Sequence, residues 1–375
     1  MVRWLMAMVA LLISVASQVE SKQMECIKIG KDRRSFILAT SDDLHPHPGP
    51  LPQREREFVP RGFNYDRDAD GRLLEDYWET EWPKVQEDFA EMKALGANVV
   101  RVHLQFGRFM QSPDKANEQA LDRLERLVSL AENTGLYLDI TGLACYRKEH
   151  IPDWYDRLSE KERWRAQAVF WGAIAARCAE RPGVFCYDLM NEPVVPTGRR
   201  EPGEWLGPPF AKVYHYVQFI ALDQQDRERP DITRDWLRTM KSAIRKHDRR
   251  HLITVGMLPT SSSGFAPKEV ARELDFLSVH IYPESSKMEE SLDTLKEFSV
   301  GKPLVIEEVF PMHCSISELR RFLTDSEKYA AGWIGFYWGK TPEQCRGSDS
   351  LADALMLGWL ELFQRETKPS ADQAK

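Results

Sequence analysis

From residue 61 onward, short apolar segments alternate with longer amphipathic ones. The short segments have the length and composition of buried strands, and the longer ones show the periodicity of helices with one apolar face. Strands are predicted at 61–65, 98–104, 136–141, 184–190, 252–257, 276–281, 304–309 and 332–338. Helices are predicted at 82–95, 117–133, 162–180, between 210 and 247, and at 351–364, and helical segments separate the later strands.

Alternation of this kind requires parallel strands joined by right-handed crossovers. Eight strand–helix repeats predict that the sheet closes into a (β/α)8 TIM barrel of the α/β class, and 375 residues can form such a barrel as one domain. An open doubly wound sheet is the structural alternative. That fold usually carries a glycine-rich phosphate loop after its first strand, and neither GxGxxG nor GxxxxGK[ST] occurs here.

The first 22 residues are predicted to be a signal peptide and leader. Arg3 precedes an apolar run at 5–15 that is too short to span a membrane, and small residues would suit cleavage before Gln18. The mature protein is then expected to be secreted or periplasmic, without membrane contact after cleavage. An uncleaved buried helix is the alternative.

Between the leader and the barrel, residues 23–60 are predicted to form a small β-hairpin from 27–29 and 36–39. A proline-rich segment at 42–57 follows, which is expected to be extended and exposed. The barrel itself is expected to occupy 61–370.

Composition narrows the set of partners. The formal net charge of −7 argues against nucleic acid, which needs a basic face. Six cysteines permit disulfides in an exported chain, but their pairing is left open, and no CxxC pair supports a zinc site. His45 and His47 lie among prolines, which prevent the buried strand that a metal-binding pair would need. No metal or cofactor is expected, and a monomer is predicted.

Two predicted strands end in carboxylates. One runs from Val184 into Asn191-Glu192-Pro193, and the other runs through 303–310 and contains Glu307 and Glu308. In parallel α/β proteins the carboxyl ends of the strands meet at the edge where the chemistry is placed. The two together predict an enzyme that works with a pair of carboxylates.

Other polar residues also fall at strand ends. The period of a strand places Arg101 and His103 on one face. A buried arginine needs an anionic partner, and a strand-end carboxylate is the natural one. The same period lets only one of the adjacent Glu307 and Glu308 point inward, and it does not by itself decide which. The remaining polar or aromatic candidates are Asn64, Thr141, Asn191, Glu192, His280, Tyr282 and Trp338.

Five short segments occur in order at fitting barrel positions: Arg61-Gly-x-Asn64, Asn98-Val-Val-Arg101, Asn191-Glu-Pro193, His280-Ile-Tyr282-Pro and Lys302-Pro-Leu-Val-Ile-Glu-Glu308. Jointly they resemble the retaining glycoside hydrolases of family 5, the cellulase and mannanase group. The likeness runs from about residue 27 to the end. One departure is that the family usually has a histidine at the end of the third strand, where this chain reads Leu-Asp-Ile-Thr-Gly at 138–142.

The resemblance implies a hydrolase that cleaves β-glycosidic bonds of a β-mannan or β-glucan type poly- or oligosaccharide. Glu192 would be the general acid/base and Glu308 the nucleophile. The family spacing favours Glu308 over Glu307 for this role, so Glu307 is expected to be structural. Asn191 would bond the sugar 2-hydroxyl, while Arg101 and Tyr282 would hold Glu308. The implied substrate-binding set is Asn191, Arg101, His103, His280, Tyr282, Trp338 and Asn64, although His103 fits an interior histidine as well as a substrate contact.

Physical chemistry agrees with these roles. Retention of configuration needs two carboxyl groups about 5–5.5 Å apart, with pKa values pushed in opposite directions. Arg101 would lower the pKa of Glu308, whereas Glu192, with no cation expected nearby, would have a raised pKa. A carbohydrate-binding barrel without turnover and a metal-dependent barrel hydrolase are the alternatives. The sugar, the linkage and endo or exo cutting are left open.

Overall fold

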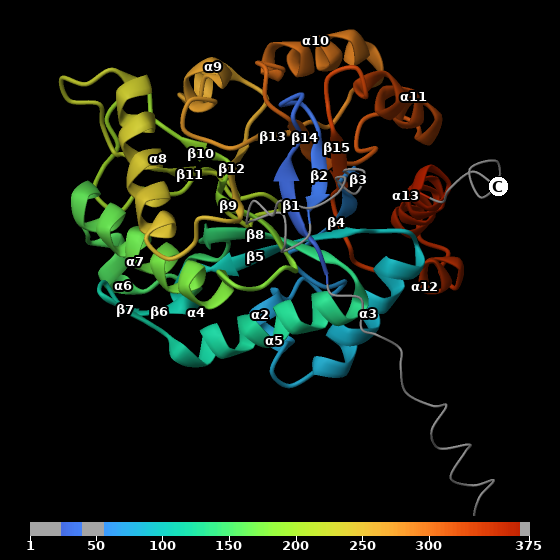
Figure 1. The fold of residues 1–375 in the computed structure, drawn as a ribbon, viewed down its shortest axis with the longest axis horizontal. Coiled ribbons are helices and arrows are strands. Elements are labelled where there is room, and N and C mark those ends of the chain that lie inside the picture. Colours follow the sequence, from blue (N-terminus) through green and yellow to red (C-terminus); the bar gives the residue numbers. More distant parts are fainter. Residues whose placement is uncertain (1–23, 40–55, 368–375) are drawn as a thin grey trace, which may run out of the picture.

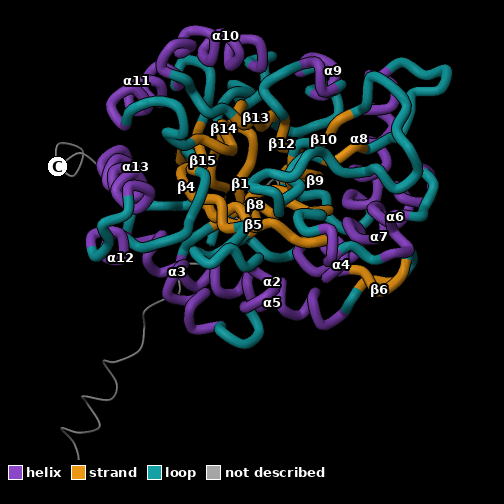
Figure 2. Tube along the Cα trace, turned by 180° about the vertical axis from the view of Figure 1, so that it is seen from behind, coloured by secondary structure: helices purple, strands orange, loops and turns teal. Residues whose placement is uncertain are grey.

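The computed structural model describes residues 24–39 and 56–367. Eight strands form a closed barrel, and each strand pairs with its neighbours in parallel. The predicted (β/α)8 barrel is confirmed. Figure 2 shows the strands in the middle of the molecule with helices around them. The barrel strands are β4 (Arg61–Tyr65), β5 (Val99–Gln105), β8 (Tyr137–Ala144), β9 (Val184–Asn191), β12 (Leu252–Met257), β13 (Leu277–His280), β14 (Leu304–Val309) and β15 (Gly332–Gly335).

A helix follows each barrel strand and returns the chain to the other end (Figure 1). Local signals set several ends: Gly135 ends α5 in the left-handed region at φ 71°, and Ser159 with Glu162 forms a capping box at the start of α7. The helices are α3 (Trp82–Ala94), α5 (Glu118–Thr134), α7 (Glu160–Cys178), α8 (Arg229–Arg245), α9 (Pro267–Val270), α10 (Met288–Phe298), α11 (Ile316–Ser326) and α13 (Leu351–Thr367). Shorter helices lie in the connections: α2 (Leu74–Tyr77), α4 (Phe106–Phe109), α6 (Asp153–Asp156) and α12 (Pro342–Arg346).

The connection after β9 differs from the prediction. Helices were expected between 210 and 247, but only α8 forms there, beginning at Arg229. The residues before it make a long loop containing β11 (Gln218–Phe219), which pairs with β10 (Pro193–Val194). This pairing fixes the loop beside the end of β9. A second small pair, β6 (Met110–Ser112) with β7 (Lys115–Ala116), follows β5.

The amino end of the barrel is covered by a small antiparallel sheet of β1 (Cys26–Ile29), β2 (Phe36–Ala39) and β3 (Arg56–Phe58). Figure 1 shows β1 and β2 over the middle of the strand ring. Phe36 packs edge-on against Phe185 and Phe276 with ring centroids 5.2 Å apart in both pairs. Strand β3 includes residues 56 and 57, which were expected in the exposed proline-rich segment. The rest of that segment, His45 and His47, and the predicted leader lie outside the described residues.

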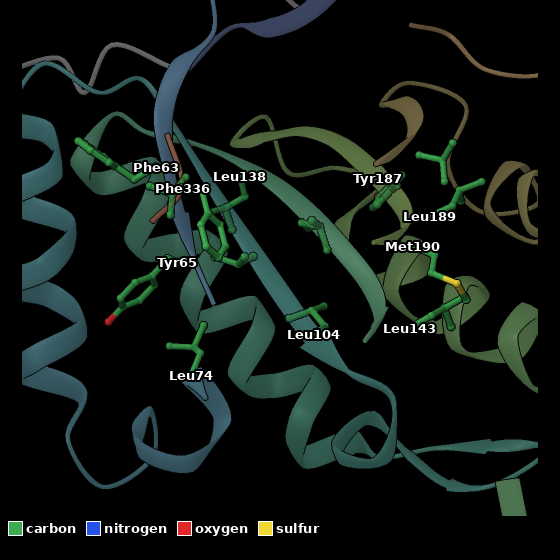
Figure 3. Close-up of a cluster of buried hydrophobic side chains, with 14 of the residues drawn as sticks. Phe63, Tyr65, Leu74, Leu104, Leu138, Leu143, Tyr187, Leu189, Met190 and Phe336 are labelled. Atoms are coloured by element: carbon green, nitrogen blue, oxygen red, sulfur yellow. The ribbon is translucent and has the colours of Figure 1, made fainter. Parts of the chain in front are cut away.

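The main core lies between the barrel and its helices. Val100, Val102 and Leu104 alternate outward along β5 into this layer, while Arg101 and His103 face the barrel interior. Figure 3 shows part of the layer, with Leu104 and Leu138 among other buried side chains. Because apolar packing fills the outer face of each strand, polar residues on the inner face are collected along the barrel axis.

Two further sequence questions are answered by the described residues. All six cysteines are free thiols, and five of them are buried, so they behave as small core residues. Within the parts of the chain that the structure describes, no helix has both the length and the apolar character needed to cross a membrane.

Candidate active site

The end of β9 presents Glu192 at the carboxyl mouth of the barrel. Every residue of β9 is buried, and the chain then turns at Glu192, whose φ is 46°. The backbone amide of Glu192 donates to the carbonyl of Gly256 on β12, and its carbonyl accepts from Gln218. Two neighbouring strands, β12 and β11, therefore hold the backbone of Glu192, and its side chain keeps 14% of its surface exposed.

Strand β14 carries two adjacent glutamates that both reach the barrel interior. Glu308 Oε1 lies 2.7 Å from Arg101 Nη1, and Glu307 Oε2 lies 3.5 Å from Arg101 Nη2. The expectation that only one could point inward is wrong. The register shifts between Ile306 and Val309 against β15, and again opposite His280 against β13. Such an irregularity interrupts the period of two and turns both side chains to one side.

Exposure separates the two glutamates. The Glu307 side chain has no solvent exposure, whereas that of Glu308 keeps 7% and opens to the mouth. Tyr282 Oη donates to Glu308 Oε2 over 2.5 Å, and Arg101 occupies the other oxygen. Only Glu308 can therefore touch a molecule that enters from the mouth, while Glu307 stays in the layer below.

Glu192 and Glu308 face one another. One carboxylate oxygen of Glu192, one of Glu308 and a ring nitrogen of His280 all lie within 4.8 Å of each other. His280 Nδ1 is 2.9 Å from Glu192 Oε1 and 3.6 Å from Glu308 Oε1. The two carboxylates thus share a gap that is bridged on one side by the imidazole.

His280 carries a positive charge at neutral pH. Burial lowers its pKa, but the charge of Glu308 and contacts with Glu192 and Glu307 outweigh burial and raise the pKa to about 10. The expectation that Glu192 lacks a cationic neighbour is wrong, because this histidine comes from β13, on the far side of β12 from β9. The alternation of side chains along one strand cannot predict the contact between His280 and Glu192, because the two residues come from different strands.

Arg101 is the centre of a fully buried network. Its Nη1 donates to Asn64 Oδ1 and Glu308, and its Nη2 donates to Asp188 Oδ2 and Asn191 Oδ1. Burial alone would lower the pKa of Arg101, but the surrounding carboxylates raise it well above its usual value. A guanidinium with this many partners fixes both Glu308 and Asn191, which places its role in positioning rather than in substrate contact.

Two predicted substrate-binding residues lie behind the site. The amide of Asn64 donates to the carbonyls of Glu307 and Gly335, and its oxygen accepts from Arg101. His103 lies between Asn64 Oδ1 and the hydroxyl of Tyr146. Since the Asn64 oxygen can only accept, His103 must carry its hydrogen on Nε2. Both side chains are buried with their polar atoms engaged, so neither is free for a substrate.

Trp338 is also misplaced by the prediction. Strand β15 ends at Gly335, three residues before the expected end, so its alternation does not extend to Trp338. The indole packs against Phe63, and its N–H donates to Asp88 of α3, outside the barrel. Phe336 faces the mouth instead.

A cavity of about 210 Å³ opens over the two carboxylates. Phe336 packs edge to face against both Tyr282 and Tyr216, with ring centroids 6.0 Å and 6.3 Å apart. The cavity is lined by Glu192, Pro208, Phe210, Tyr216, Val217, Tyr282, Glu308, Met312 and Phe336.

Comparison with known protein families shows to which family the chain belongs. The family model described as Cellulase (glycosyl hydrolase family 5) matches residues 56–339. The chain belongs to glycosyl hydrolase family 5. It is therefore an O-glycosyl hydrolase, and the segments at Asn64, Arg101, Asn191, His280 and Glu308 all fall within the match.

Solved structures share the fold of this family 5 chain. An exo-β-1,4-mannosidase from Opitutaceae bacterium strain TAV5 has 18% identity and a TM-score of 0.62, and the alignment covers 85% of this chain but 60% of the mannosidase. A GH5_18 protein from Streptomyces cattleya, in complex with Manβ1-4GlcNAc, has 17% identity and a TM-score of 0.60, covering 84% and 82%. A β-1,4-mannanase from the sea hare Aplysia kurodai has 14% identity and a TM-score of 0.53, covering 78% and 92%. No curated protein sequence matches the chain.

Below the mouth, this family 5 barrel holds a second group of acidic side chains, which the sequence analysis did not predict to lie together. Oxygens of Asp139, Asp188 and Glu307 lie within 4.8 Å of each other, and all three side chains are buried. Burial, with the charges of Glu307 and Asp188, raises the pKa of Asp139 well above its usual value. Burial also raises the pKa of Asp188 to about 6. For Glu307, burial is outweighed by Arg101 and His280, and the pKa is lowered. Of the three acids, Asp139 is therefore the one whose neutral, protonated form is most favoured by its surroundings.

These acids and the Glu192–His280–Glu308 group are the two sets, among the described residues, that approach close enough to bind a metal. In the lower set Arg101 Nη2 lies 2.7 Å from Asp188 Oδ2 and 3.5 Å from Glu307 Oε2, so a guanidinium already supplies the positive charge that an ion would bring. The upper set is bonded to Arg101, Tyr282 and His280. The residues are thus better matched to a metal-free ion network.

Proposed function

We propose that the chain is a retaining β-glycosidase in which Glu192 is the general acid/base and Glu308 is the nucleophile. The observation that carries the proposal is the approach of their carboxylate oxygens to within 4.8 Å. Retaining enzymes hold their two carboxyl groups about 5–5.5 Å apart, whereas inverting enzymes leave about 6.5–9.5 Å for a water molecule. The short gap supports direct attack on the sugar.

In the first step, Glu308 attacks the anomeric carbon while Glu192 gives its proton to the glycosidic oxygen, and the aglycone leaves as an alcohol. In the second step, Glu192 removes a proton from water, the water oxygen attacks the anomeric carbon, and the bond to Glu308 breaks. The hydrogen bonds from Arg101 and Tyr282 hold both oxygens of Glu308 and orient the carboxylate for attack.

His280 determines which oxygen of Glu192 carries the proton. Nδ1 of the imidazolium lies 2.9 Å from Glu192 Oε1 and donates to it, so the transferable proton belongs on Oε2. Nε2 is turned to Glu307, 3.5 Å away. Glu307 therefore stabilises the charged form of His280, and His280 orients Glu192 toward the leaving oxygen.

For the substrate we propose a β-mannoside or β-glucoside of the mannan or glucan type. Support comes from structural neighbours that are named as an exo-β-1,4-mannosidase and a β-1,4-mannanase. The cavity of about 210 Å³ is smaller than the roughly 300–1,000 Å³ of sites that enclose drug-sized ligands, which favours one ring-sized group at a time.

The decisive experiment combines substitution with trapping. Glu308→Gln and Glu192→Gln should each lower kcat by about a thousandfold or more while melting temperature changes little, because both side chains face the cavity. A 2-deoxy-2-fluoro β-mannosyl or β-glucosyl fluoride should add one sugar mass to wild type, on the peptide that contains Glu308. The surface variant Glu327→Gln serves as the control and should keep full activity.

Substantial hydrolysis by either variant would refute the assignment. Stoichiometric binding of sugar by wild type with no trapping and no turnover would instead indicate a carbohydrate-binding barrel without catalysis.

We also propose that the protein is exported, because an apolar run at 5–15 follows Arg3 as in a signal peptide. We propose in addition that the mature protein is a monomer. Amino-terminal sequencing of mature protein from its native host should start at or near Gln18, and sedimentation should give a single chain mass. A retained Met1 would contradict export.

A further inference from the structure

One segment of the chain supplies most of the apolar side chains that line the cavity. Residues 207–217 follow β10, which begins directly after Glu192. Pro208, Phe210 and Val217 of this segment line the cavity, with Met312 from the loop after β14 completing the wall. We call these four side chains the apolar rim.

Two side chains of the apolar rim are unusually exposed to solvent for large apolar residues. Phe210 keeps 51% of its surface exposed and Met312 keeps 40%, and neighbouring Val213 keeps 43%. These are three of the four large apolar side chains that stand out as exposed across residues 24–39 and 56–367, the fourth being Leu351. Apolar side chains that gather beside a cavity mark a binding surface more often than scattered ones do.

Residues 207–217, which carry three of the four rim side chains, are held in place by hydrogen bonds within the protein. The backbone of Phe210 exchanges two hydrogen bonds with Tyr214, and Gly207 donates to the carbonyl of Val217. The hydroxyl of Tyr214 donates to the carbonyl of Gly71 over 2.6 Å. A surface fixed in this way loses little conformational freedom when a ligand binds.

The same wall has few polar groups to offer. Tyr216 Oη donates to Asp66 and accepts from Arg67, and Tyr282 Oη donates to Glu308. The carbonyls of Tyr216 and Val217 accept from Asn191 and Gly207. Apart from the two carboxylates, the side-chain polar atoms of the cavity are thus already engaged. Hydroxyl groups of a second sugar pressed against this wall would lose water and find few free hydrogen-bond partners there.

We propose that the apolar rim binds the aglycone of the substrate, and that this aglycone is an apolar alkyl or aryl group rather than a second sugar. The inference rests on the proposed function, because a general acid must face the leaving group, and three of the four rim side chains come from the segment that follows Glu192. Aromatic and thioether side chains provide an apolar contact surface of the kind that such a group needs.

The main comparison is between octyl and methyl glycosides, whose leaving groups differ in apolar area but have similar acidity. Wild type is assayed with three mannosides, which are n-octyl β-mannoside, methyl β-mannoside and β-1,4-mannobiose. It is also assayed with the three matching glucosides, which are n-octyl β-glucoside, methyl β-glucoside and cellobiose. We expect kcat/KM for the octyl glycoside to exceed that for the methyl glycoside by about tenfold or more, mainly through a lower KM. The disaccharide should be a poorer substrate than the octyl glycoside.

Phe210→Ala and Met312→Ala should each lower kcat/KM for the octyl glycoside by up to about tenfold, and should lower kcat/KM for the methyl glycoside by a clearly smaller factor. Leu351→Ala is the matched control, since Leu351 is 86% exposed on α13 and lines no part of the cavity. Equal kcat/KM for octyl and methyl glycosides, preference for the disaccharide, or an equal loss on all substrates in Phe210→Ala would overturn the inference. Failure of wild type to hydrolyse any of the six would count against the proposed function instead.

Discussion

The two ends of the barrel are closed by opposite chemistry. At the amino end, Phe36 and Phe58 from the small sheet pack against Phe185, Phe276 and Tyr137 of the barrel. At the carboxyl end the same strands present an arginine, a charged histidine and a series of carboxylates. The amino end gains stability from apolar contact, whereas the carboxyl end holds charges that only each other can compensate. The amino end therefore contributes to stability alone, whereas the charged residues of the carboxyl end contribute both to stability and to catalysis.

Arg101→Met should have the largest effect, because it breaks both properties at once. Removing one partner of a buried ion network costs about 3–5 kcal/mol, since Asp188, Glu307 and Glu308 are left uncompensated. Urea unfolding should report this loss, and kcat should fall with it because Glu308 loses its orientation. A variant with wild-type kcat would show that Glu308 is held without the arginine.

Phe36→Ala should cost a similar amount of stability but leave the chemistry intact. Deleting a buried phenyl ring typically lowers the free energy of unfolding by about 3–5 kcal/mol. Because Phe36 contacts only the amino end, kcat/KM at a temperature well below the melting transition should equal that of wild type. A parallel fall in kcat would mean that the two ends are coupled and would break the comparison.

The pH dependence of stability should single out the carboxyl end. The folded pKa of His280 is about 10, above the unfolded value of about 6.5. Its contribution is therefore fully present below about pH 6.5 and is lost as the pH rises toward 10. Urea unfolding at pH 6, 8 and 10 should show the gap between wild type and His280→Gln narrowing with pH. A constant gap would show that the imidazole is neutral throughout.

Trp338→Phe should have the smallest effect. The substitution removes one hydrogen bond to Asp88 and keeps an aromatic ring against Phe63, so about 1 kcal/mol of stability should be lost. The value of kcat/KM should not change, whereas Phe336→Ala should lower it. A large loss of activity in Trp338→Phe would return this residue to the sugar-binding set.

Much of the scaffold was predictable because alternation of strand and helix is recorded locally in the chain. The positions of Glu192 and Glu308 at strand ends followed from the same pattern. Trp338 was misassigned because β15 ends early, and Glu307 because an irregularity in β14 is set by its neighbours rather than by its own residues. Periodicity assumes regular strands, so it fails where the register shifts.

The lower acid cluster and the apolar rim could not be read from the sequence for a different reason. Asp139, Asp188 and Glu307 come from three strands, and their proximity exists only once the barrel closes. Phe210 lies in a connection where helices were expected, and its exposure follows from a turn in which Ala211 and Lys212 both have positive φ. Neither residue type signals such a turn.

The segment after Glu192 joins the proton donor and the surface beside it in one stretch of chain. Exchanging residues 207–217 for a segment from a relative would change the group that is accepted for release while the attacking carboxylate, carried by a different strand, stays where it is. Natural diversification and laboratory redesign can thus change this one short segment without altering the catalytic residues below it.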